Sequence, residues 1–158
     1  MNRGQFGFSL MELIVVMGII GLLLVVALPQ FNRGVLNASS ATQGVVADLR
    51  VARANATGRG VHFRVTFSSA SYTVQRLKQN NGNWVVDSAF AAQTVQAPSG
   101  VSFTTIQGDG TIEFDTRGLI VPLSGQLVGE TEIIRVTDSV RGKTKTLQVW
   151  PSGQVLEV

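Results

Sequence analysis

Glu12 is the most unusual chemically active residue of this chain, because it lies in the otherwise apolar stretch GFSLMELIVV. A carboxylate that is buried in an apolar or membrane setting without a partner is costly, so such acids usually mark an electrostatic partner. The acid could also merely complement the dipole at a helix N-terminus. We favour the first interpretation, in which Glu12 contacts a positive charge.

The other residues with catalytic or metal-binding potential are few. His62 is the sole histidine and cysteine is absent, which excludes disulfides, thiolate metal sites and the usual zinc sites. Alternation along its strand predicts that His62 is exposed. Asp109, Glu113 and Asp115 lack the spacing of a calcium loop, and no nucleophile motif accompanies the histidine. We therefore predict no catalytic residues, no metal site and no cofactor, and hence a protein that is not an enzyme.

One basic cluster could contact nucleic acid. Arg141, Lys143 and Lys145 lie in the segment RGKTK, and Arg135 lies on the preceding predicted strand. A loop of this kind can bind phosphates, although most such runs are solvated hairpin loops. The net charge of +3 in 158 residues adds little support. Nucleic-acid contact is possible but not favoured.

These residues need elements to position them, and the first is an apolar segment. Residues 13–28 carry no charged and no polar side chain. With residues 9–11 added, the segment approaches the roughly 20 residues that a membrane-spanning helix needs. A removable signal peptide and a plain membrane anchor are the alternatives. The first fits poorly because no small-residue cleavage site precedes Pro29, and the second leaves Glu12 unexplained.

The helical pattern continues beyond Pro29. A three-four spacing is followed by Phe31, Val35, Ala38, Val45, Leu49, Ala52 and Ala56, with Thr42 as the polar member. We predict one helix over residues 9 to about 57, ended by Gly58 and Gly60. Gly21 and Pro29 weaken the intervening segment, which could melt or kink there. The glycines could instead allow close helix packing in a bilayer.

From residue 61 onward the apolar period changes to two, which predicts strands. The expected strands cover residues 61–68, 72–77, 84–86, 101–106, 111–114, 119–121, 132–137, 146–150 and 154–158, with NNGN at residues 80–83 closing a hairpin. The expected core residues are Phe63, Phe67, Val74, Phe103, Phe114, Ile134 and Val149. The fold class is α+β, with a long N-terminal helix packed on a C-terminal antiparallel β-sheet head.

The N-terminus resembles that of the type IV pilin-like proteins, the pilins and pseudopilins. The matching residues are Arg3 and Gly7 of a short leader, then Phe8, Ser9, Leu10, Met11 and Glu12, the apolar run with Gly18 and Gly21, and Pro29. The resemblance implies that prepilin peptidase cuts between Gly7 and Phe8 and methylates the new amine of Phe8. By the same resemblance, that amine would be the positive partner of Glu12 on a neighbouring subunit, and the charge pair would set the register between the two subunits.

The resemblance further implies an organisation and a location. Residues 1–7 would be the prepilin leader, 8–30 the transmembrane and assembly helix, 31–58 its amphipathic continuation and 59–158 the β-rich globular head. The protein would be a single-pass protein of the bacterial inner membrane with its head in the periplasm. It would then join other pilins or pseudopilins in a filament, with help from an inner-membrane assembly platform.

Within that family, the segment TIEFDTRG at residues 111–118 and the β-rich end are most similar to the minor pseudopilin and minor pilin group GspH/FimT. The resemblance implies a minor pilin or pseudopilin of a type IV pilus or type II secretion system, with a place at the filament tip. Some minor pilins of this type bind DNA during natural transformation, which gives the alternative function. Their Gly-Arg-x-Arg element is missing here, since the chain reads GQVL at residues 153–156.

Overall fold

The computed structural model describes residues 11, 13–19, 38–122 and 130–158. The chain divides into two compact units, Met1–Val35 and Leu36–Val158. In the first unit, residue 11 and residues 13–19 are helical. Their large apolar side chains are all exposed, from 47% for Val16 to 74% for Met11. Among the residues described, no helix combines the length and the apolar character that crossing a membrane requires.

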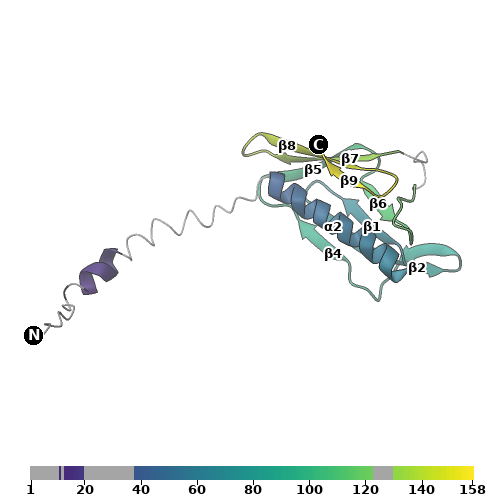
Figure 1. The fold of residues 1–158 in the computed structure, drawn as a ribbon, viewed down its shortest axis with the longest axis horizontal. Helices are drawn as coiled ribbons and strands as arrows, with labels where there is room; N and C mark the ends of the chain where they lie inside the picture. Colours follow the sequence, from purple (N-terminus) through teal and green to yellow (C-terminus); the bar gives the residue numbers. More distant parts are fainter. Residues whose placement is uncertain (1–10, 12, 20–37, 123–129) are drawn as a thin grey trace, which may run out of the picture. The chain divides into compact units, whose positions relative to one another are not determined.

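The second unit, which we call the head, begins with helix α2, Ala38–Arg59. Its buried residues are Ala38, Thr42, Val45, Leu49, Ala52 and Ala56. This confirms the predicted stripe over the part of the helix that is described, including its polar member. The Thr42 hydroxyl donates a 2.6 Å hydrogen bond to the carbonyl oxygen of Ala38, so the buried hydroxyl is satisfied within the helix. Figure 1 shows α2 lying across strands of both sheets.

The first sheet is antiparallel and has the order β3-β2-β1-β6, with β4 also paired to β2. Its strands are β1 Phe63–Phe67, β2 Ser71–Asn80, β3 Asn83–Val86, β4 Gln93–Gln96 and β6 Thr111–Phe114. The β2–β3 hairpin closes where predicted, at Asn81 and Gly82, whose φ angles are 49° and 84°. Two successive positive φ angles are the requirement of a tight type I′ hairpin turn, which Asn-Gly meets at low cost.

The second sheet is also antiparallel and has the order β5-β7-β8-β9. Its strands are β5 Val101–Gln107, β7 Glu132–Asp138, β8 Lys143–Val149 and β9 Val155–Glu157. The two sheets are joined at their margins, because the amide of Phe103 donates to the carbonyl oxygen of Ser69, and that of Ile120 donates to Pro151. One helix therefore covers two linked sheets.

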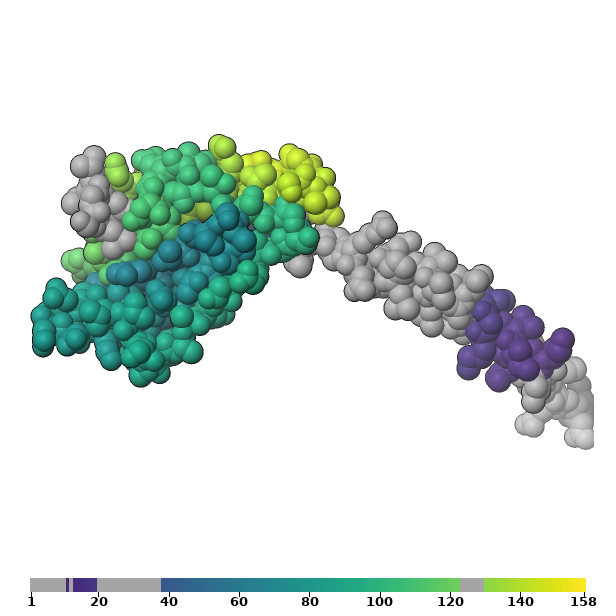
Figure 2. Space-filling model, turned by 180° about the vertical axis from the view of Figure 1, so that it is seen from behind, coloured from purple at the N-terminus to yellow at the C-terminus, as the bar shows by residue number. Residues whose placement is uncertain are grey.

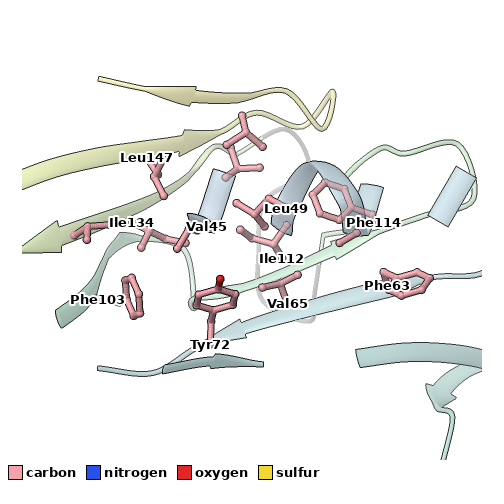
Figure 3. Close-up of a cluster of buried hydrophobic side chains, with 14 of the residues drawn as sticks. Val45, Leu49, Phe63, Val65, Tyr72, Phe103, Ile112, Phe114, Ile134 and Leu147 are labelled. Carbon is pink, nitrogen blue, oxygen red and sulfur yellow. The ribbon is translucent and has the colours of Figure 1, made fainter. Parts of the chain in front are cut away.

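The core lies between α2 and the two sheets (Figure 3). Five of the predicted core residues are buried, namely Phe63, Phe103, Phe114, Ile134 and Val149. Phe67 and Val74 are only half-buried and pack against the core from its edge. Tyr72 was not predicted as a core residue, yet it is buried and its ring contacts the rings of Phe67 and Phe103.

Two strand predictions differ from the structure. Residues 119–121 do not form a strand, and only an isolated bridge joins Ile120 to Phe114. Strand β4 was missed because its sequence, QTVQ, has one apolar residue and therefore little alternation. Its formation depends on pairing with β2, a long-range contact that a local pattern does not reveal.

Candidate functional site

The predicted processing and assembly residues Gly7, Phe8, Glu12, Gly21 and Pro29 lie outside the described residues. The neighbouring helical residues 13–19 are described, and their apolar side chains point to solvent within their own unit. An apolar surface that surrounds a helix requires another apolar environment, either lipid or other helices. This segment is therefore suited to packing against lipid or against other apolar helices.

The outer face of α2 is lined mainly by small or uncharged residues, with Arg50 as a charged member. Gln43, Gly44, Ala47, Val51 and Ala54 are exposed on this helix, and Val51 has 57% of its surface exposed. A side-chain carbon added at Gly44 would meet nothing within 4 Å. Small side chains let another backbone approach a helix closely. Thus α2 buries one stripe in the head and leaves the opposite face exposed.

Arg53 fixes α2 to the turns that precede β9 and follow β6. Its Nε donates a 3.0 Å hydrogen bond to the carbonyl oxygen of Gly118, and one terminal nitrogen donates at 2.8 Å to that of Ser152. Gly118 and Gly153 both have a φ of 76°. A side chain at Gly153 would collide with the carbonyl oxygen of Gly118 and with Arg53. The two glycines therefore allow the turns and the arginine to approach.

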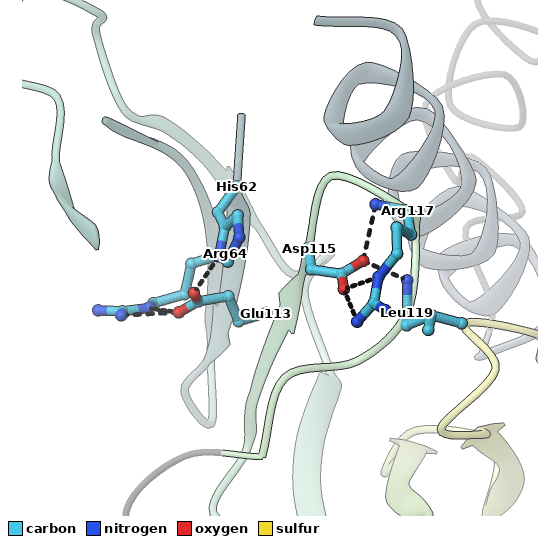
Figure 4. Close-up of polar contacts among 6 residues, drawn as sticks. All are labelled: His62, Arg64, Glu113, Asp115, Arg117 and Leu119. Atoms are coloured by element: carbon cyan, nitrogen blue, oxygen red, sulfur yellow. Dashed lines mark hydrogen bonds and ion pairs between the residues drawn. The ribbon is translucent and has the colours of Figure 1, made fainter. Parts of the chain in front are cut away.

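Asp115 organises the turn within TIEFDTRG (Figure 4). Its carboxylate accepts hydrogen bonds from the amides of Arg117 and Leu119 at 2.8 and 2.9 Å, and from the Arg117 guanidinium at 2.9 Å. Burial alone would raise the pKa of Asp115, but the hydrogen bonds from Leu119 and Arg117 outweigh burial and lower it below its ordinary value. Asp115 therefore acts as a charged structural cap.

Glu113 binds two basic residues of β1 and the segment before it (Figure 4). His62 Nδ1 lies 2.7 Å from one carboxylate oxygen, and Arg64 contacts the other at 2.8 and 3.0 Å. The prediction that His62 is exposed was wrong, because only 7% of its surface is exposed. Its ring stacks on that of Trp84, with centroids 3.8 Å apart. Trp84 lies on β3, and the β2–β3 hairpin brings its ring against His62. The alternation of residues along one strand does not reveal cover from another strand.

Asp87 is buried at the base of the same hairpin. Arg76 donates two hydrogen bonds to one oxygen of Asp87, and Lys78 Nζ lies 3.5 Å from the other. Hydrogen bonding from Arg76 lowers the pKa of Asp87 and outweighs the effect of burial. The Arg76 guanidinium also lies 4.9 Å from the centre of the Phe90 ring. These contacts hold the β2–β3 hairpin to the segment that leads into β4.

The basic cluster on the β7–β8 hairpin is partly neutralised by its own neighbours. Arg141 contacts Asp138 at 3.4 Å, and Lys145 contacts Glu157 at 2.9 Å. Lys145 pairs in register with Val136, whereas Arg135 pairs with Thr146, so alternation places Arg135 on the opposite face. Figure 2 shows the C-terminal residues, coloured yellow, at the surface along one edge of the head. Nucleic-acid contact by Arg141, Lys143 and Lys145 therefore stays a prediction.

The acidic residues of the β5–β6 region do not converge. Glu113 faces His62, Asp115 caps its own turn, and Asp109 accepts a hydrogen bond from the amide of Thr111. Among the residues that the structure describes, no group of three histidine or acidic side chains could hold a metal ion. Each of these three carboxylates instead has its own structural partner.

Comparison with known proteins adds one motif and one fold. The model of the prokaryotic N-terminal methylation motif matches residues 2–28. No curated protein matches the chain. The solved structure of the minor pseudopilin EpsH from the type 2 secretion system of Vibrio cholerae is similar, with a TM-score of 0.57 and 12% identity over 77% of this chain and 96% of that chain.

The minor pilin FimU of Pseudomonas aeruginosa is similar in two crystal forms. One gives a TM-score of 0.54 with 12% identity, covering 76% of this chain and 91% of that chain. The other gives 0.55 with 13% identity, covering 75% and 85%. At this level of identity the likeness shows the fold, a helix packed on antiparallel sheets.

Proposed function

We propose that this chain, a type IV pilin-like protein by its N-terminal motif and its fold, is a minor structural subunit of a type IV pilus or a type II secretion pseudopilus. The observation that carries the proposal is the joint presence of the methylation motif at residues 2–28 and a head with the fold of minor pilins and pseudopilins. The two features together are more specific for this class of subunit than either one alone, because the motif covers only residues 2–28 and the similar structures share 12% identity with the chain.

The geometry of the described residues supports a mechanical role. The apolar side chains of residues 13–19 offer surface for packing against other helices, and α2 leaves one face exposed. Arg53 ties α2 to the turns that border both sheets, so that a force applied to this helix is passed to the sheets. In this role the N-terminal helix joins other pilins in the filament. The head then lies at the filament tip, where it helps to start assembly and contacts partners.

The finer steps belong to the same proposal. Prepilin peptidase cuts between Gly7 and Phe8 and methylates the Phe8 amine, and Glu12 of one subunit neutralises that amine on a neighbour. The segment between Gly21 and Pro29 loses helicity when the subunit enters the filament. Residues 1–7 serve as leader, 8–30 as transmembrane and assembly helix, 31–58 as its amphipathic continuation and 59–158 as the β-rich globular part of the head. Before assembly the protein lies in the inner membrane with its head in the periplasm, where it meets the assembly platform.

Intact mass and N-terminal sequencing of the protein from membranes of its native host test the proposal. We expect a chain that begins at N-methylated Phe8. Gly7→Val should accumulate as uncut protein, because bulk at the scissile residue obstructs cleavage. Gly4→Val is the matched control within the leader and should be processed normally. A wild-type chain that begins at Met1, in cells with active prepilin peptidase, would overturn the proposal.

A further inference from the structure

A cavity of about 90 Å³ lies between α2 and the first sheet. Helix α2 forms one wall, β1 and β2 form the opposite wall, and the segment leading into β4 closes one side. Its rim is apolar and open to solvent, since Val51 is 57% and Phe90 40% exposed. Exposed apolar residues around a cavity favour a ligand that also carries apolar surface.

The polar part of the cavity is negatively charged. The carboxylate of Asp48 lies in the wall, and its Oδ2 accepts a 2.5 Å hydrogen bond from the Tyr72 hydroxyl. Burial, followed by this contact with Asp48, raises the pKa of Tyr72, so the phenol keeps its proton and donates. Asn55 and Gln93 add amide groups, each with an oxygen that can accept a hydrogen bond. The cavity thus offers several acceptors and one full negative charge.

The remaining wall is aromatic and aliphatic. The rings of Phe63 and Phe90 meet edge to face, with centroids 6.5 Å apart, and Val74 lies beside them. Figure 3 shows Phe63 and Tyr72 on the face of the first sheet that carries the core. Arg76 is the cation that contacts Phe90, and its charge is matched by Asp87. Arg76 therefore leaves the charge of Asp48 available to a ligand.

We propose that this cavity binds the side chain of a lysine from a partner protein. The methylene stem of lysine matches the walls formed by Phe63 and Phe90, and its compact ammonium group donates to Asp48 and the neighbouring amides. The planar guanidinium of arginine needs a wider opening and a flat acceptor arrangement, so arginine fits less well. This inference goes beyond the proposed function and stands without it, because the cavity is complete within one head.

The test is a nuclear magnetic resonance titration of the full chain in detergent with the peptide acetyl-Gly-Gly-Lys-Gly-Gly-amide. We expect amide signals of the residues around the cavity to shift first. Asp48→Asn keeps the shape of the side chain but removes the charge, and should weaken binding about tenfold or more. Glu130→Gln removes an exposed carboxylate that does not line the cavity and should leave binding unchanged. Phe90→Ala removes a half-exposed wall and provides a second variant if Asp48→Asn perturbs folding.

Two further peptides distinguish the contribution of the ligand's charge from that of its head-group shape. Replacement of lysine by acetyl-lysine keeps the stem and removes the charge, whereas replacement by arginine keeps the charge and changes the head group. Selective binding of the lysine peptide, lost in Asp48→Asn or Phe90→Ala, would support the proposal. Equal binding of the acetyl-lysine peptide, shifts centred on another surface, or unchanged affinity in both cavity variants would overturn it. None of these results depends on processing at Gly7 or on filament assembly.

Discussion

Arg53 joins α2 to two distant turns of the head, because its guanidinium donates hydrogen bonds to the carbonyl oxygens of Gly118 and Ser152. Arg53→Met keeps much of the aliphatic stem and removes both bonds, so we expect a loss of about 1 to 3 kcal/mol in the free energy of unfolding. Urea unfolding followed by tryptophan fluorescence measures this loss. Arg50→Met, an exposed change on the same helix, should stay within about 0.5 kcal/mol. Equal effects of the two variants would contradict the bridging role.

Asp115 makes the stability of the head depend on pH in the acidic range. Its pKa is lowered from an ordinary value of 3.8, so the folded state prefers the ionised form. The resulting stabilisation is fully present above about pH 4 and is lost as the pH falls through the lower pKa of the folded protein. Asp87 contributes in the same direction, because its pKa is also lowered.

We therefore expect the free energy of unfolding to fall as the pH is reduced from 5 towards 2. Asp115→Asn should lower stability by about 1 to 3 kcal/mol at pH 7 and make the acid limb shallower, because one carboxylate no longer titrates. Urea unfolding at a series of pH values provides both numbers. Glu130→Gln removes an exposed acid elsewhere in the head and serves as the control. A wild-type slope retained in Asp115→Asn would show that other carboxylates cause the acid limb.

The individual residues also show where sequence patterns stop being informative. Glu113 and His62 occur 51 positions apart, and nothing local indicates that β1 and β6 pair and bring them together. Alternation predicted an exposed His62, but Trp84 covers it from another strand. Arg53 likewise has no local signal, since its partners are backbone oxygens of distant turns. Such contacts depend on topology, which residue spacing does not fix.

At the scale of elements, α2 is the best-predicted part of the described chain because its pattern is periodic. Leu49 is fully buried in the stripe, and Val51 on the same helix is mostly exposed. Leu49→Ala should destabilise the head by about 2 to 5 kcal/mol through lost burial and a cavity. Val51→Ala should change stability by no more than about 0.5 kcal/mol. Thermal unfolding of both variants checks the contrast, and similar losses would show that α2 is not packed through this stripe.

The strands were predicted less evenly, for an identifiable physical reason. β1, β5 and β7 alternate clearly and have aromatic or β-branched residues, so local pattern and burial agree. The Asn-Gly turn between β2 and β3 has its own sequence signal and was placed correctly. β4 is polar and exists through its pairing with β2, while residues 119–121 have strand-like residues but no continuous partner. Pairing therefore decides the cases that alternation leaves open.

At the scale of the whole molecule, two parts of the sequence favour different surroundings. Residues 13–28 contain no polar side chain, whereas the head places the carboxylates of Glu113, Asp87 and Asp115 beside cations or backbone amides. The first part needs lipid or other apolar helices, and the second is stable in water. A subunit that leaves a membrane to enter a filament meets both needs, because helices of neighbouring subunits replace the lipid around the apolar segment.

Glu12 tests this exchange of surroundings directly. In a filament, its charge would be matched by the methylated Phe8 amine of a neighbour, while processing itself requires no such pair. Glu12→Ala should therefore be cut and methylated normally but enter filaments about tenfold less, which corresponds to about 1.4 kcal/mol. The measurement compares the processed protein in sheared filaments with that in membranes of the native host. Glu12→Gln keeps the shape without the charge and should behave like Glu12→Ala, whereas Glu12→Asp should retain part of the incorporation. If Glu12→Ala entered filaments at the wild-type level, the charge pair would not set the register, and packing of the apolar helix alone would have to account for assembly.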